Sequence, residues 1–403
     1  MNENRYRSMS ARFHVNRRSF LKVGGAVGAG LALGTPPVFG QDAKEEAPAK
    51  PWTNVGSVLG APKTEHSLPG PFPGRVVEVH DPASMTDDGA VAPVVAAMFR
   101  RGVKTLTGEG MGGSFARFFT KEDVVGIKVN PVGAGLISTR LELVDAIVAW
   151  LEEGGIPRRN IVIWDRFEGM LREAGFTEER YPGVRIEGLQ MMDESAASGE
   201  SEDDSGWRDE NGVHRSAGRF DMEVFYRADV EAPEDDGYLN QHVVNGRDSY
   251  FGKIVTKDLT KIINVPVFKN TGNGVSMATK NLGYGAICNT GRLHRPLFFD
   301  VCTEVLAFPA IRDKLVLNVT DGLRAQYDGG PMPNAQATWL YHRIFFATDP
   351  FALDMVCHDL MVAKRKEMGI EVNEHPRYSE YLRYAEKLGL GVADPGKTEF
   401  VRV

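Results

Sequence analysis

The stretch Val-Val-Gly-Ile-Lys-Val-Asn at residues 124–130 decides the fold, because it is a short apolar run that ends in polar side chains. The next periodic segment, residues 141–151, has apolar residues at helical spacing and stops at two glycines, Gly154 and Gly155. A second apolar run, Ile-Val-Ile-Trp-Asp, follows at residues 161–165. This order predicts a β-α-β unit, and therefore a parallel sheet with right-handed crossovers.

Strand-like and helix-like segments continue on both sides of this unit. We expect further strands at residues 76–79, 262–267, 314–319 and 343–347. We expect further helices at residues 87–100, 297–307, 351–364 and 378–388. Together these segments predict an α/β fold, with a mostly parallel sheet and helices on both faces, in a single domain over residues 75–403.

The pattern breaks down between about residues 190 and 250. Residues 193–210 hold eight acids and one arginine among serines and glycines, which predicts an irregular, acidic, solvated insertion. Calcium binding there is disfavoured, because the acids do not follow the D-x-D-x-D-G order of a calcium loop. Residues 41–74, rich in Pro, Lys, Glu and Gly, predict a flexible or surface-hugging lead-in.

The N-terminal segment resembles a twin-arginine (Tat) export signal. The residues that carry the resemblance are Asn-Arg-Arg-Ser-Phe-Leu-Lys at 16–22, with Asn16 where the pattern usually has Ser or Thr. Five glycines make the apolar stretch at 23–39 too short and too poorly helical for a stable membrane anchor. We expect a signal peptide over residues 1–40, recognition by the Tat translocation machinery, and a periplasmic or otherwise exported location.

Charge and cysteine content exclude several classes of function. Residues 1–40 hold six basic side chains and one acid, and without them the formal net charge changes from -7 to -12. Such an acidic body repels nucleic acids and anionic lipids. Cys288, Cys302 and Cys357 are too few for a protein-encoded iron-sulfur site, and their apolar context favours buried free thiols over a disulfide.

Polar side chains follow four of the predicted strands. Lys128 and Asn130 end the first, Asp165 and Arg166 the second, Lys269 and Asn270 the third, and Asp321 the fourth. Ligands of open parallel sheets bind beyond the carboxyl ends of the strands, so these side chains mark the expected site.

The longest polar and glycine-rich stretch runs from residue 269 to residue 294. It contains Lys280, Asn281, Arg292 and His294. Glycines allow close backbone approach, and the cations suit a phosphate or carboxylate, so we expect a small anionic ligand. Neither a phosphate-binding G-x-x-x-x-G-K-[ST] loop nor a G-x-G-x-x-G dinucleotide motif is present.

Six separated motifs keep the order found in the domain of unknown function 362 family. They are Ile-Lys-Val-Asn at 127–130, Asn-Val-Pro-Val-Phe-Lys at 264–269, Lys-Asn-Leu-Gly at 280–283, Asp-Gly at 321–322, Gly-Pro at 330–331 and Asp-Pro-Phe-Ala-Leu-Asp at 349–354. The chain resembles that family over about residues 75–365. Many members have His soon after the motif lysine, whereas this chain has Asn270 and Thr271 after Lys269. Some members carry appended iron-sulfur modules, so the resemblance implies a fold and a site more than a reaction.

The candidate residues divide into three roles. We expect Asp165 and His294 to be catalytic, as base and proton carrier, and Asp321 to hold a possible divalent metal. The expected ligand-binding residues are Lys128, Asn130, Lys269, Asn270, Lys280, Asn281 and Arg292.

Structural roles compete with these assignments. Lys128 could pair with a carboxylate, Asp165 could cap a helix, and Asp321 could form a turn. Asp349, before Pro350, is a predicted helix N-cap, and Asp354 could support the site.

Three functions fit the sequence. The first is an exported enzyme acting on an anionic small molecule. The second is a redox protein that holds a non-covalent cofactor loaded before export. The third is a non-catalytic binding or assembly protein. Serine hydrolase, zinc protease and thiol protease motifs are absent from the sequence.

Overall fold

The computed structural model describes residues 50–191, 209–210, 213–230, 242–244, 246–294, 297–373, 375 and 378–403. The predicted signal peptide and most of the predicted acidic segment lie outside these residues. The described part of the lead-in, from residue 50 to residue 74, packs against the rest of the protein. Thr53 forms an isolated β-bridge with Ala228, and Leu68 is buried.

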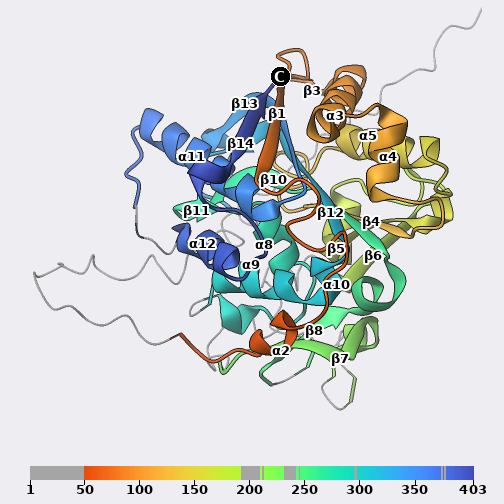
Figure 1. The fold of residues 1–403 in the computed structure, drawn as a ribbon, viewed down its shortest axis with the longest axis vertical. Coiled ribbons are helices and arrows are strands. Elements are labelled where there is room, and N and C mark those ends of the chain that lie inside the picture. The colour runs from red at the N-terminus through yellow and green to blue at the C-terminus, as the bar shows by residue number, and fades with distance from the viewer. Residues whose placement is uncertain are drawn as a thin grey trace, which may run out of the picture.

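A ten-stranded mixed sheet forms the centre of the molecule (Figure 1). Its order is β14-β1-β13-β12-β9-β4-β5-β6, with β10 attached beside β12 and β11 beside β10. The strands are β1 (Arg75–His80), β4 (Val125–Lys128), β5 (Ile161–Phe167), β6 (Arg185–Gln190), β9 (Lys261–Asn264), β10 (Val267–Thr271), β11 (Gly274–Val275), β12 (Leu315–Gln326), β13 (Thr338–Ala347) and β14 (Glu399–Arg402). Only β13, against β1 and β12, and β11 run antiparallel to their neighbours, so the predicted mostly parallel sheet is confirmed.

Two further pairs of strands stand apart from this sheet. They are β2 (Met85–Thr86) with β3 (Gly89–Ala90), and β7 (Phe220–Arg227) with β8 (Asp248–Gly252).

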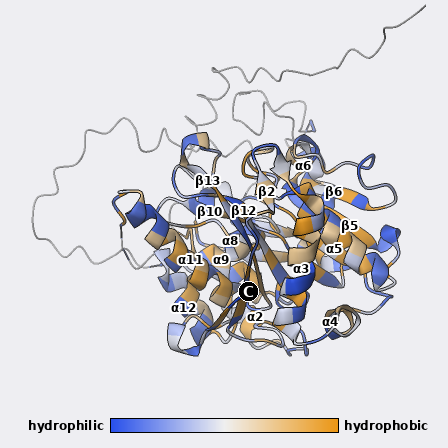
Figure 2. Cartoon of the chain, turned by 90° about the horizontal axis from the view of Figure 1, so that it is seen from above, coloured by the Kyte–Doolittle hydropathy of each residue, from blue (hydrophilic) through white to orange (hydrophobic). Residues whose placement is uncertain are grey.

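Helices cover both faces of the sheet, as predicted. Figure 1 and Figure 2 show α3, α4 and α5 on one side and α8, α9, α11 and α12 on the other. The helices are α2 (Gly56–Leu59), α3 (Ala92–Thr107), α4 (Met111–Phe118), α5 (Leu141–Glu153), α6 (Glu168–Glu173), α8 (Ala278–Gly283), α9 (Asp300–Glu304), α10 (Pro309–Arg312), α11 (Pro350–Glu367) and α12 (Glu380–Lys387). Among the described residues, no helix is long and apolar enough to cross a membrane.

The β4-α5-β5 unit follows the sequence pattern closely. In α5, Leu143, Ile147 and Trp150 are buried, as their spacing requires, and Trp150 packs against Phe99 of α3 and Phe115 of α4. Gly126 in β4 has no room for a Cβ, because Leu259 and the Trp164 indole already fill that space. Adjacent strand ends are in register: Lys128 pairs with Trp164 of β5 and with Asn264 of β9.

Some predicted boundaries were wrong. The predicted strand at 262–267 is two strands, β9 and β10, interrupted at Pro266. The predicted helix at 87–100 begins at Ala92, because the β2-β3 hairpin precedes it. The three cysteines are buried free thiols, as expected from their apolar context.

Candidate functional site

The candidate site lies at the carboxyl ends of β4, β5, β9 and β10 and is covered by α8. Lys128 ends β4 and is almost fully buried. Its ammonium donates to Asp165 Oδ1 at 2.5 Å, to the Val129 carbonyl at 2.9 Å and to Asn281 Oδ1 at 3.1 Å. All three N–H donors of this ammonium are therefore used, and its charge is paired with one carboxylate.

A chain of buried amides fixes α8 to the strand ends. Asn281 Oδ1 accepts from Lys128 and also from Asn130 Nδ2 at 3.1 Å. Asn281 Nδ2 donates to Asn264 Oδ1 at 2.8 Å, and Asn264 Nδ2 donates to Asn318 Oδ1 at 2.9 Å. Because buried amides are costly to leave unpaired, this chain determines one arrangement of the four elements that carry it.

Asp354 of α11 holds the first turn of α8. Its carboxylate accepts from the backbone N–H groups of Ala278 at 2.8 Å and Thr279 at 2.9 Å, and from the Thr279 hydroxyl at 2.6 Å. Asp349 caps α11 through the N–H groups of Phe351 and Ala352, which confirms the predicted N-cap. The motif at 349–354 therefore holds the start of α8 in place from α11.

Lys269 lies beside the amide chain and is fully buried. Its Nζ donates to Asn130 Oδ1 at 3.0 Å and to the Val132 carbonyl at 3.1 Å, and it contacts no carboxylate. Burial, together with Lys280 and Lys128 and against the opposing effect of Asp165, lowers the pKa of Lys269 to about 7.

Lys280, on α8, is partly exposed and lies over two aromatic rings. Its Nζ is 5.2 Å from the Tyr284 ring centre and 5.5 Å from that of Phe298. In the part of the chain that the structure describes, this ammonium has no hydrogen-bond acceptor and no carboxylate partner. Burial lowers the pKa of Lys280, and nearby Lys128 also lowers it, whereas Cys302 opposes the shift.

Arg166 ends β5 and is buried with its guanidinium only partly satisfied. Nη1 donates to the Thr290 hydroxyl at 2.5 Å, but Nε and Nη2 are buried without an acceptor. Several arginines have a buried, unpaired Nε; among the described residues, only Arg166 has a terminal Nη that is both buried and unpaired. Burial lowers the pKa of Arg166 to about 10 against the opposing effects of Cys288 and Asp165, so the group stays charged at pH 7.

His294 belongs to the same cluster. Its ring is 4.7 Å from that of Tyr284, and Nδ1 lies 3.0 Å from the Thr290 carbonyl, which makes Nδ1 the protonated nitrogen. Burial lowers the pKa of His294 to about 3, and Lys280 and Arg166 add to the shift. The ring is therefore neutral at pH 7 and could accept a proton only at high cost.

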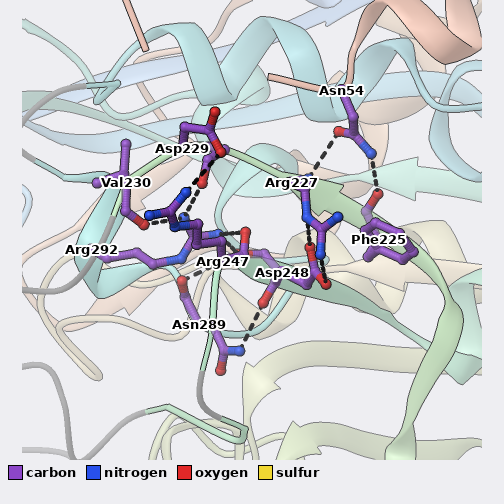
Figure 3. A network of polar contacts seen from close by, with 11 residues as sticks. Asn54, Phe225, Arg227, Asp229, Val230, Arg247, Asp248, Asn289 and Arg292 are labelled. Atoms are coloured by element: carbon purple, nitrogen blue, oxygen red, sulfur yellow. Dashed lines mark hydrogen bonds and ion pairs between the residues drawn. The ribbon is translucent and has the colours of Figure 1, made fainter. Parts of the chain in front are cut away.

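The structure places Arg292 away from these cations, against the β7-β8 hairpin. Nη1 donates to the carbonyls of Ala228 at 3.1 Å and Val230 at 3.0 Å. Nη2 donates to the Arg247 carbonyl at 2.7 Å and to the Ser249 hydroxyl at 2.9 Å. Figure 3 shows this guanidinium inside a network of backbone and carboxylate contacts, which leaves neither terminal nitrogen for a ligand.

Asn270 and Asp321 also have internal partners. Asn270 Oδ1 accepts from the Gly330 N–H at 3.0 Å, and its Nδ2 donates to the Gly272 carbonyl at 2.9 Å, so it joins two loops. Asp321 accepts from the Arg140 N–H at 2.7 Å at the start of α5. Burial raises its pKa, and Arg140 opposes that shift. Across the described ranges, no three His, Cys, Asp or Glu side chains gather to form a metal site.

The cluster therefore contains five of the predicted ligand residues, both predicted catalytic residues, and Arg166. The five are Lys128, Asn130, Lys269, Lys280 and Asn281. The sequence located Arg166 at a strand end, but nothing in its neighbourhood indicated that its guanidinium would be buried without acceptors. Asn264 stood inside the motif at 264–269, and its amide role could have been considered from its position at the end of β9.

Comparisons with known proteins agree with the motifs. The sequence model of the family described as Domain of unknown function (DUF362) matches residues 125–359, more than half of the chain. The model of the TAT (twin-arginine translocation) pathway signal sequence matches residues 14–34, which confirms the predicted export signal. A search of curated proteins found no match.

Proposed function

We propose that this chain, which belongs to the DUF362 family and is exported by the twin-arginine pathway, acts as an enzyme on a small molecule with at least two negative charges. The ligand would bind between Arg166, Lys269 and Lys280, with Lys128 and Asp165 behind it. Asp165 is the candidate base, whereas the lowered pKa of His294 argues against the role of proton carrier that the sequence predicted for it.

The observation that carries the proposal is the pair of unpaired cations, Arg166 and Lys280. A buried N–H donor without an acceptor costs about 1–3 kcal/mol, and more when the group is charged. Arg166 has two such nitrogens, and the ammonium of Lys280 has no acceptor among the described residues. An anion between them would satisfy the donors and compensate the charge.

The charge balance indicates the class of ligand. Three cations, Lys128, Lys269 and Arg166, interact with one carboxylate, Asp165, and a fourth, Lys280, lies near Lys128 and Lys269. After Lys128 is paired, two to three positive charges are left, depending on the protonation of Lys269. A phosphate ester or a di- or tricarboxylate matches that charge, and the aromatic rings of Tyr284 and Phe298 offer an apolar wall beside it.

Calorimetric binding of inorganic pyrophosphate and citrate would test the proposal, with acetate as a singly charged control. The wild type should bind pyrophosphate or citrate at least tenfold more tightly than acetate. Arg166→Gln and Lys280→Met should each weaken that binding by about tenfold, which corresponds to about 1.4 kcal/mol. Native mass spectrometry of the purified protein must first show that the site is empty.

Lys314→Met is the matched control. Lys314 is also a partly buried lysine, but it lies at the amino end of β12, at the opposite end of the parallel strands from the site, and donates to the Val255 carbonyl at 2.6 Å. Its affinity for the probes should equal that of the wild type. Equal, negligible binding of every probe by the wild type and by both site variants would eliminate the proposal.

The burial of the site favours a related possibility, that the ligand is a cofactor acquired before export. Lys128, Arg166 and Lys269 are each less than a tenth exposed. A ligand that contacts all of them exchanges slowly, and the twin-arginine pathway carries folded proteins. Native mass spectra of protein from the exported fraction should then show one added mass that disappears on unfolding; an unmodified mass would exclude this variant of the proposal.

A further inference from the structure

We propose that Lys269 is the proton acceptor of the anion site: at pH 8 its amine is neutral in the free protein, and it becomes an ammonium when the anion binds. This inference rests on the proposed function. It adds that the site takes up its ligand together with a proton.

The hydrogen-bond count supports a neutral amine. Lys269 Nζ has two acceptors, Asn130 Oδ1 and the Val132 carbonyl, and both are neutral oxygens. A neutral amine has two N–H donors, which these two oxygens satisfy, whereas an ammonium has a third. Because Lys269 is fully buried, that third donor would have no water to accept it.

Lys128, in the same site, has the hydrogen-bond count of an ammonium. It has three acceptors for three N–H donors, and one of them is the Asp165 carboxylate at 2.5 Å. The site therefore contains one lysine arranged as an ion-paired ammonium and one arranged as an amine. Among the described residues of the cluster, the carboxylate of Asp165 pairs with Lys128 and not with Lys269.

Two of the three charges around Lys269 also favour the neutral amine. Lys128 of β4 and Lys280 of α8 disfavour its protonation, and Asp165 of β5 favours it. The paired position on β12 is the neutral Gln326, and Ser276 donates to the Lys269 carbonyl from the other side. Together with burial, these groups give Lys269 a pKa of about 7.

An anion reverses this balance, because it adds negative charge where two cations now dominate. The amine then takes one proton, and no other bond changes. The proton comes from the solvent when the ligand has none to give. When the ligand carries an acidic proton, the same transfer is general-base catalysis by Lys269.

The free protein can be tested by NMR with ¹³C-labelled lysine side chains. One lysine signal should titrate with a midpoint near pH 7, and it should be missing from Lys269→Arg and from Lys269→Met. A spectrum in which every lysine titrates above about pH 9 would overturn the inference, and it would leave the anion site itself intact.

Binding of sulfate, whose charge is constant between pH 6 and 8, tests the coupling. From a pKa of about 7, wild-type affinity should be about tenfold higher at pH 6 than at pH 8. At pH 8, calorimetry in buffers of different ionisation enthalpy should show uptake of about one proton. Lys269→Arg, which is always charged, should bind with no uptake at Lys269 and with little pH dependence.

Lys314→Arg is the control and should keep both the pH dependence and the proton uptake. Sulfate binding without proton uptake by the wild type would overturn the inference alone. Absence of sulfate binding at every pH, with citrate and pyrophosphate also unbound, would overturn the inference and the proposed function together.

Discussion

The Lys128–Asp165 pair provides the sharpest test of the electrostatics, through the substitution Asp165→Asn. The change keeps the shape of the side chain but removes the carboxylate 2.5 Å from Lys128 Nζ. Both partners are less than a tenth exposed, so water cannot replace the lost charge. Removing one partner of a buried pair costs about 3–5 kcal/mol. We therefore expect the free energy of unfolding to fall by about 3 kcal/mol at pH 7.

The pH dependence of this loss has a definite sign. Burial lowers the pKa of Lys128, and Asp165 is the group that opposes this shift. Without Asp165, the folded protein binds its proton on Lys128 less tightly, while the unfolded chain keeps the ordinary value of about 10.4. Between those two values the unfolded state binds more protons, so stability of the variant rises with pH. The difference from the wild type should shrink between pH 7 and pH 9.

Urea unfolding at pH 7 and pH 9, followed by tryptophan fluorescence, measures both effects, because Trp164 lies 5.5 Å from the Lys128 ammonium. Glu153→Gln is the control: it breaks the exposed pair with Arg100 and should cost less than about 1 kcal/mol. The double variant Lys128→Met/Asp165→Asn should lose about 2 kcal/mol less than the sum of the single variants. Two results would refute the reasoning. One is a fall in the free energy of unfolding of Asp165→Asn of less than about 1 kcal/mol at pH 7. The other is a difference in stability from the wild type that grows toward pH 9.

Three further predictions concern the groups that position or titrate in the site. In Gly285→Ala, the new Cβ would clash with the Asn281 backbone carbonyl and lie 2.5 Å from Lys128 Cε, so calorimetry should show about tenfold weaker citrate binding. Unchanged affinity would mean that both groups can move without loss of the site. Asp354→Ala removes the carboxylate that accepts three hydrogen bonds at the start of α8, so the free energy of unfolding in urea should fall by about 3 kcal/mol. Anion binding should weaken too, since Lys280 lies on that helix; a loss of stability with full affinity would contradict this. In the wild type, the folded protein has released the Lys269 proton between pH 7 and pH 10 while the unfolded chain keeps it, so the free energy of unfolding should rise with pH in this range. Lys269→Met should show a smaller rise, measured by urea unfolding. Parallel pH profiles would show that Lys269 is charged when folded.

The sequence predicted the sheet and much of the cluster, because both depend on local patterns. Helical spacing in residues 141–151 and the two flanking apolar runs define the β4-α5-β5 unit without reference to the rest of the chain. Parallel strands then bring their carboxyl ends to one edge, so Lys128 and Asp165 become neighbours as a consequence of register. Periodicity and one topological rule were sufficient for this part.

The placement of Arg292 and Asp321 depended on information that is not local. Arg292 follows the site motifs closely in sequence, but its turn faces the β7-β8 hairpin, and that hairpin lies in the region where the sequence pattern broke down. Asp321 was expected at a strand end, but β12 continues to Gln326, so it lies within the strand and pairs with Val267 after the break at Pro266. In both cases the direction of a side chain was set by a distant pairing partner.

Hydrogen-bond satisfaction separates the scaffold of this site from its working groups. Lys128 and Asn281 have their donors paired inside the protein, and any ligand that took those donors would have to break the amide chain. Arg166 keeps two buried donors without acceptors, although burial makes such donors costly, and the partly exposed Lys280 has no acceptor among the described residues. A fold that only needed stability would gain by replacing them with apolar groups of similar size. Their presence in the described part of the cluster is best explained by a ligand that accepts hydrogen bonds from them. The binding energy of that ligand would offset the free energy that these unpaired groups cost the free protein.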